Sequence, residues 1–152
     1  MSFEERLTKE DIKSLEAAQG GVEQRDSVRF QVSRRLSPEA EASLQMVGLE
    51  EWEIELCQAW AGLSTPAGVT EECRYAKYVL DEMPLPPKPG ILNSGVLDKE
   101  QFWDQMGLAE HLDFFSGARH FQVRFPESRT ALGQTALKVI KHWRAFAEEN
   151  WP

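Results

Sequence analysis

The spacing of apolar residues predicts that most of the chain is helical. The clearest pattern covers residues 129–149, where one face is apolar and the opposite face carries lysine and arginine. This is the pattern of an amphipathic helix that lies on a hydrophobic core. The apolar face contains Leu132, Ala136, Val139, Ile140, Trp143, Phe146 and Ala147.

Four more helices are predicted by residues that typically cap a helix N-terminus. They begin after Thr8, Ser37, Thr70 and Asp98. The first has the pattern of a capping box, because Asp11 follows three residues after the cap. The helix after Ser37 is predicted to continue to about Leu63, with a kink near Gly48.

Two short segments instead alternate apolar and polar residues, which is the period of a half-buried strand. They are residues 28–32 and residues 119–125. An isolated pair of strands is marginally stable in water, so either a third strand lies near residues 91–97 or the pair packs against helices. The predicted fold class is α+β, a helix-dominated single domain with a small sheet containing these strands.

One domain is expected over residues 1–152. A chain of this length buries about 70% of the surface that its unfolded form exposes, so it needs no disulfide or metal to fold. Four prolines between residues 84 and 89 predict an extended internal connector at residues 83–97. The tripeptide Phe-Gln-Val occurs in both predicted strands, and chance is favoured over a duplicated strand–helix unit as its cause.

The net charge of −8 belongs to one part of the chain. Residues 36–82 contain ten acidic and two basic residues, whereas residues 1–35 and 83–152 each contain equal numbers of both. An acidic surface repels phosphate backbones and attracts basic proteins. We therefore expect a basic protein partner and not a nucleic acid; the alternative is that the charge serves only solubility.

The chain lacks the sequence features of a membrane or secreted protein. No apolar run approaches the ~20 residues that span a bilayer, and residues 1–13 lack the apolar core of a secretory signal. We predict no membrane association and a cytoplasmic location. Cys57 and Cys73 are then expected to be buried thiols, because disulfides are rare in a reducing compartment.

The helix predicted after Ser37 carries the candidate partner-binding site. One wide apolar stripe runs along it from Leu49 to Leu63, and Ile54 falls on the far side. Glutamates surround these positions, which gives an apolar centre with an acidic rim, as in many protein interfaces. The alternative is that another helix of the same chain covers Ile54. The predicted partner-binding residues are Glu50, Glu51, Glu53, Ile54 and Glu55.

Catalytic signatures are missing from the sequence. It has no glycine-rich phosphate loop, no Gly-x-Ser-x-Gly elbow and no His-Glu-x-x-His motif, so no catalytic residue, cofactor site or metal ligand is predicted. We interpret the chain as a small acidic intracellular protein-binding module, with the composition of an immunity protein or an antitoxin-like inhibitor of a basic partner. The alternatives are an accessory subunit or secretion-type chaperone, and an enzyme with an unrecognised site. An open strand edge would also permit a homodimer.

Overall fold

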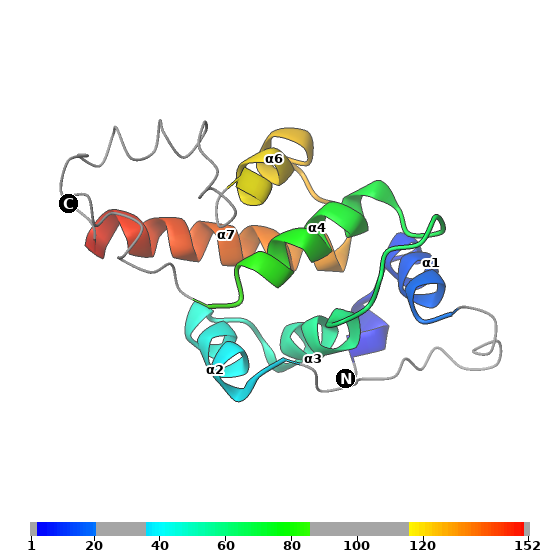
Figure 1. The fold of residues 1–152 in the computed structure, drawn as a ribbon, viewed down its shortest axis with the longest axis horizontal. Helices are drawn as coiled ribbons and strands as arrows, with labels where there is room; N and C mark the ends of the chain where they lie inside the picture. The colour runs from blue at the N-terminus through cyan, green and yellow to red at the C-terminus, as the bar shows by residue number, and fades with distance from the viewer. Residues whose placement is uncertain (1–2, 21–35, 86–115, 151–152) are drawn as a thin grey trace.

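A computed structural model of the chain describes residues 3–20, 36–85 and 116–150. These residues form a short 3-10 helix and six α-helices, joined by turns and loops (Figure 1). The elements are η1 (Phe3–Arg6), α1 (Lys9–Ala18), α2 (Pro38–Val47), α3 (Glu51–Trp60), α4 (Glu71–Glu82), α6 (Ser116–Arg124) and α7 (Ala131–Asn150). None of the described helices is long and apolar enough to cross a membrane.

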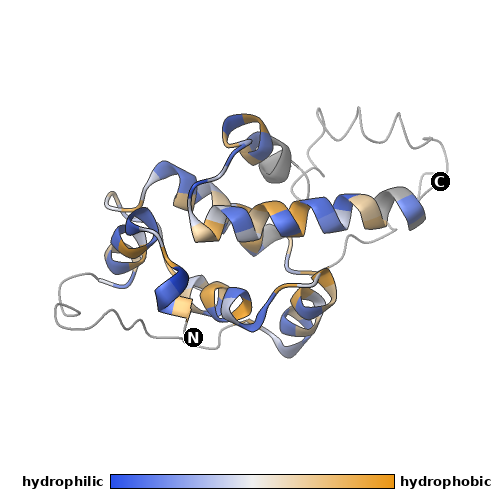
Figure 2. Cartoon of the chain, turned by 180° about the vertical axis from the view of Figure 1, so that it is seen from behind, coloured by the Kyte–Doolittle hydropathy of each residue, from blue (hydrophilic) through white to orange (hydrophobic). Residues whose placement is uncertain are grey.

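The long helix α7 organises the arrangement of the others. α4 packs along α7 and also contacts α6, while α2 and α3 contact α7 and each other. Figure 1 shows α6 on one side of the α4–α7 pair and α2 and α3 on the other. Seen from behind in Figure 2, hydrophobic and hydrophilic residues alternate along the helices, as expected of amphipathic helices with buried apolar faces.

The apolar face of α7 lies at the centre of the core, as its sequence pattern predicts. Its buried side chains belong to one hydrophobic cluster with those of α4, α3 and Phe121 of α6. The indole Nε1 of Trp143 on α7 donates a hydrogen bond, at 3.1 Å, to the carbonyl of Met83 at the end of α4. The buried residues of α7 in this cluster are Ala131, Leu132, Ala136, Val139, Ile140 and Trp143.

Three predicted helix starts are confirmed by their capping hydrogen bonds. In each case a Ser or Thr oxygen accepts from the backbone N–H three residues on, over 3.0 to 3.5 Å. The capping residues are Thr8, Ser37 and Thr70. Asp11 completes the predicted capping box by accepting from the Thr8 N–H at 3.0 Å. The helix predicted after Asp98 lies outside the described residues.

The single helix predicted over residues 38–63 is in fact two helices. α2 ends at Val47, and Gly48 has a φ of 93°, a left-handed conformation that favours glycine because it has no Cβ. Backbone hydrogen bonds from Gly48 and Leu49 close this helix end. α3 then starts after Glu50, so the chain breaks the helix completely instead of kinking it.

The predicted α+β class is wrong, because the described residues contain helices and no strand. Most of the segment predicted as a strand at residues 119–125 belongs to α6. The alternating pattern does not distinguish a strand from a helix at positions 121 and 125, because residues four apart lie on the same face in both structures. Phe121 is buried and Phe125 is partly buried, as both periods require, but Val123 between them is 77% exposed. Only the helical period explains an exposed Val123.

Three further sequence predictions fall partly or wholly outside the described residues. The strand predicted at residues 28–32 and the third strand near residues 91–97 are not described. Of the predicted connector at residues 83–97, the structure describes only residues 83–85. α4 ends just before them, at Glu82, as the following prolines predict.

Two buried carboxylates from other helices hold the N-terminus of α7. Asp11 of α1 accepts hydrogen bonds from the N–H groups of Ala131 at 2.7 Å and Leu132 at 3.1 Å. Glu72 of α4 accepts hydrogen bonds from the N–H groups of Arg129 at 3.3 Å and Thr130 at 2.8 Å. Negative charge stabilises the positive end of a helix dipole. These contacts therefore fix α1, α4 and α7 to one another.

Candidate functional site

The five predicted partner-binding residues lie at the N-terminal half of α3, and they differ in exposure. Glu50 and Glu51 are exposed, and Glu55 is partly exposed. Ile54 is 7% exposed, and Glu53 is only 1% exposed. The exposed carboxylates are available to a partner, whereas Glu53 is enclosed by the fold.

A groove of about 320 Å³ lies between α2 and α3, and its lining includes three of the five predicted residues. Leu49 and Ile54 are almost fully buried, so they form its floor. The more exposed carboxylates form its walls, so the groove has a largely buried apolar floor between acidic side chains. The lining consists of Glu41 and Gln45 of α2, Leu49 of the turn, and Glu51, Ile54, Glu55 and Gln58 of α3.

Gln58 connects the two walls of this groove. Its side chain is 3% exposed, and its Oε1 accepts a hydrogen bond from the Leu36 N–H at 3.1 Å. Its Nε2 lies 3.5 Å from Oε2 of Glu41 and donates to it. The buried amide therefore orients the Glu41 carboxylate on the α2 wall relative to α3.

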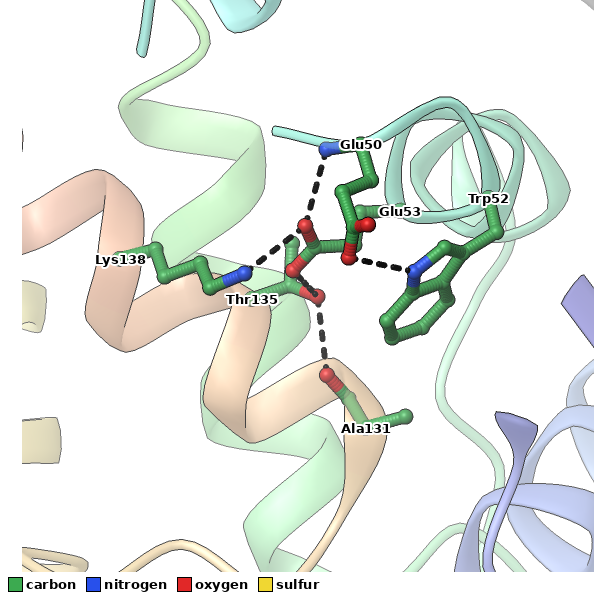
Figure 3. Close-up of polar contacts among 6 residues, drawn as sticks. All are labelled: Glu50, Trp52, Glu53, Ala131, Thr135 and Lys138. Atoms are coloured by element: carbon green, nitrogen blue, oxygen red, sulfur yellow. Dashed lines mark hydrogen bonds and ion pairs between the residues drawn. The ribbon is translucent and has the colours of Figure 1, made fainter. Parts of the chain in front are cut away.

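Glu53 instead anchors α3 to α7, as Figure 3 shows. Its Oε1 accepts from the Glu50 N–H and from the Lys138 ammonium, both at 3.0 Å. Its Oε2 lies 3.4 Å from the hydroxyl of Thr135, whose single hydrogen is shared between this oxygen and the closer Ala131 carbonyl at 2.9 Å. Because both of its oxygens have partners within the fold, we assign Glu53 a structural role and not a place in the acidic rim.

Glu50 is the exposed member of the same network. Its Oε2 accepts a hydrogen bond from the indole Nε1 of Trp52 at 3.0 Å (Figure 3). The Trp52 ring also contacts a cation, because the guanidinium of Arg6 lies 5.4 Å from the centre of the ring. Such a contact between a cation and an aromatic face is attractive. Glu50 thus lies beside the groove and contacts Trp52, without lining the groove itself.

The structure separates the acidic residues of segment 36–82 into two groups. Nine of the ten acidic side chains are described. Four of them bind a lysine, an arginine or backbone N–H groups: Glu53, Glu71, Glu72 and Asp81. Five others on α2, α3 and the turn between them form no ion pair with a described residue: Glu39, Glu41, Glu50, Glu51 and Glu55. The uncompensated charge therefore collects around the α2–α3 groove.

Neither cysteine has the environment of a nucleophile. Cys57 and Cys73 are free and buried. Burial, together with the nearby charges of Glu53 and Asp81, raises the pKa of the Cys57 thiol to about 12. Burial also raises the pKa of the Cys73 thiol to about 11. Because the thiolate is the reactive form, both remain unreactive thiols near neutral pH.

A second hollow, of about 430 Å³, lies where the N-terminus of α4 meets the end of α6. One of its two arginines, Arg124, forms a hydrogen-bonded ion pair with Glu71. The hydrogen bond from Arg124 lowers the pKa of the Glu71 carboxyl. The same guanidinium lies 5.9 Å from the Tyr75 ring and 5.8 Å from the Phe125 ring. Arg124 is thus engaged within the fold, and none of the predicted site residues lines this hollow.

No protein-family model matches the chain, and no significant match is found among curated proteins or among solved structures. The interpretation of the groove therefore rests on its geometry and chemistry. Within the described residues, no three histidine, cysteine or carboxylate side chains are grouped so that they could hold a metal ion.

Sequence reasoning identified the α3 wall of the groove and missed the α2 wall. Glu41 and Gln45 are four residues apart, so a helical projection places them on one face. No sequence signal, however, indicates that this face borders α3, because that contact depends on how the chain turns at Gly48. Gln58 was also missed, since its role is to bond Leu36 and Glu41, which come from distant positions in the chain.

Proposed function

We propose that this chain is a protein-binding module that receives a basic partner at the groove between α2 and α3. One observation carries the proposal: the groove combines an apolar floor, Leu49 and Ile54, with carboxylates that no described cation neutralises. Charge of this kind attracts a basic protein over distance and speeds its association. Contact with the apolar floor then slows dissociation.

A module of this kind acts by covering a cationic surface of its partner, as an immunity protein or an antitoxin-like inhibitor would. An accessory subunit or a secretion-type chaperone would use the same surface for a different partner. The two free thiols support a reducing, cytoplasmic setting for this role.

The test is the association rate of a basic partner that the full chain captures from its native host's lysate. We expect the double variant Glu51→Lys, Glu55→Lys to associate roughly tenfold more slowly at low salt, since steering as a whole contributes about 10- to 1,000-fold. The difference should shrink with added salt, because the Debye length falls from about 30 Å at 0.01 M to about 3 Å at 1 M. Glu53 is left unchanged because it is buried.

The matched control is the double variant Glu5→Lys, Glu149→Lys, which changes the net charge equally at two exposed positions that do not line the groove. Its association rate should stay close to that of the native chain at every salt concentration. Equal rates for the two double variants would show that only net charge matters, and the groove would lose its assigned function.

A further inference from the structure

The size of the α2–α3 groove limits what it can receive. Its volume of about 320 Å³ is at the lower end of the roughly 300–1,000 Å³ of small-molecule sites. Along α3 its lining extends from Glu51 to Gln58, which corresponds to about 10 Å at 1.5 Å per residue. A groove of this size accommodates one long side chain and is too small to enclose a helix or a strand.

The lining also specifies the chemistry of that side chain. The floor is aliphatic, whereas the walls carry Glu41 on α2 and Glu51 and Glu55 on α3. A side chain with an apolar stem and a cationic end matches both parts, because such residues lay their methylene groups on apolar surface and keep the charge at the rim. Lysine and arginine are the two candidates.

The placement of the acceptors distinguishes these candidates. The carboxylates come from two different helices, and the buried Gln58 orients the one on α2. A guanidinium has five donors in a planar fork and can bond carboxylates on both sides at once, whereas an ammonium acts as a compact point charge. Arginine is also the less strongly hydrated of the two, so partial burial over Ile54 costs it less.

We propose that the groove is a receptor for one arginine side chain of the partner. This inference rests on the proposed function, because it assigns the residue by which a basic partner is recognised. Glu41 on one wall and Glu51 and Glu55 on the other share the guanidinium, and the arginine stem covers Leu49 and Ile54. The partner's remaining basic residues then act only through long-range attraction.

The test uses the full chain, labelled with ¹⁵N, and three short capped glycine peptides that carry one arginine, one lysine or one citrulline. We expect the arginine peptide to shift the amide signals of the α2–α3 groove. Citrulline has the same shape without the charge and should bind at least about tenfold more weakly, the factor that one lost charge-assisted hydrogen bond implies. Lysine should fall between the two.

Two variants locate the effect. Glu41→Gln removes the acceptor on the α2 wall and should abolish the preference for arginine over lysine. Gln45→Arg places a guanidinium on that wall and should block the shifts from all three peptides. Glu5→Gln, an exposed change of equal charge outside the groove, should leave the shifts as in the native chain. Amide spectra of each variant without peptide show whether the fold is retained.

The outcomes separate this inference from the proposed function. Equal amide shifts with the arginine and lysine peptides would overturn the proposal of an arginine receptor. The same conclusion would follow if the arginine peptide caused no shifts, or caused shifts spread over the whole surface. In these cases an oligolysine peptide decides the proposed function. If it binds the native chain in a salt-dependent way and the Glu51→Lys, Glu55→Lys variant more weakly, the basic-partner surface stands without the arginine receptor. If it binds both proteins alike, the two proposals fail together.

Discussion

At the scale of single residues, buried carboxylates fix the helices of this protein relative to one another. Glu53 joins α3 to Lys138 and Thr135 of α7, and Asp11 joins α1 to the start of α7. Both side chains are at most 1% exposed. A buried carboxylate destabilises a fold unless its oxygens are bonded. Because the oxygens of both residues are bonded, each carboxylate ties together helices that are far apart in the sequence.

Replacing Asp11 with alanine should therefore lower the free energy of unfolding by about 3 kcal/mol, since a hydrogen bond to a charged group contributes about 1.5–3 kcal/mol. The change removes the acceptor for the Thr8 N–H and hydroxyl, and for the N–H groups of Ala131 and Leu132. Urea denaturation measures the loss. Glu10→Ala, at the exposed neighbouring position, should stay within about 0.5 kcal/mol of the native chain. Equal stabilities for the two variants would contradict the assigned role of Asp11.

The sequence predicts one half of what Asp11 does and not the other. Its spacing from Thr8 indicates the capping box, because the two residues lie within one helical turn. Its bonds to Ala131 and Leu132 join positions 120 and 121 residues apart. Local patterns contain no information on such a contact. For the same reason Glu53 resembles its exposed neighbours in the sequence, although the fold buries it against Lys138.

At the scale of elements, α6 shows why a short alternating pattern is a weak predictor of a strand. The segment has apolar residues at positions 121, 123 and 125, and two of these three positions satisfy a helix as well as a strand. Phe125, which follows α6, packs against Tyr75 of α4, and the two ring centres are 5.9 Å apart. This contact forms only because α4 lies next to α6. Tertiary packing therefore decided the conformation, as it often does for β-forming residues.

The helical register of α6 predicts unequal effects of two substitutions. Phe121→Ala should cost about 3–5 kcal/mol, the usual range for a buried phenylalanine. Val123→Ala should change the stability by less than about 0.5 kcal/mol, because Val123 is 77% exposed. Both are measured by chemical denaturation. In a strand the two side chains would share one buried face, so comparable losses would contradict the helical register.

The groove between α2 and α3 could be predicted only in part for a related reason. The acidic and apolar residues of α3 are visible in the sequence as a helical projection. The second wall arises because the chain breaks at Gly48 and turns α2 alongside α3. A glycine in a helical pattern permits a kink as well as a break. The choice between them depends on packing against α7, which both helices contact.

At the scale of the whole molecule, the uneven charge of the sequence becomes an uneven surface. The sequence places the net charge of −8 in residues 36–82, which the structure folds into α2, α3, α4 and the turns and loops that join them. On α4, Glu71 and Asp81 form ion pairs and Glu72 caps the start of α7. Among the described residues of this segment, the carboxylates without an ion pair are Glu39, Glu41, Glu50, Glu51 and Glu55 of α2, α3 and the turn between them, whereas Glu53 of α3 pairs with Lys138. The sequence thus predicts the amount of charge and the fold determines where it is exposed.

Helix α7 packs against α4, α2 and α3, and Trp143 joins it to the end of α4 by a hydrogen bond. The side chain is 1% exposed, its Nε1 bonds the Met83 carbonyl at 3.1 Å, and its ring contacts Phe146 edge-on at 5.6 Å. Trp143→Ala should therefore cost about 3–5 kcal/mol. Trp143→Phe keeps an aromatic ring but leaves the Met83 carbonyl without its donor, and should cost about 1–3 kcal/mol.

Urea denaturation followed by far-UV circular dichroism measures both Trp143 variants. If α7 is the common support of the described helices, each variant should unfold in one transition that shifts to lower urea, because loss of this contact weakens α4 and α7 together. The partly exposed Trp52 is the control on α3, and Trp52→Phe should shift the midpoint much less. A Trp143→Ala protein that unfolds at the native midpoint would show that α7 does not hold the core together through this residue.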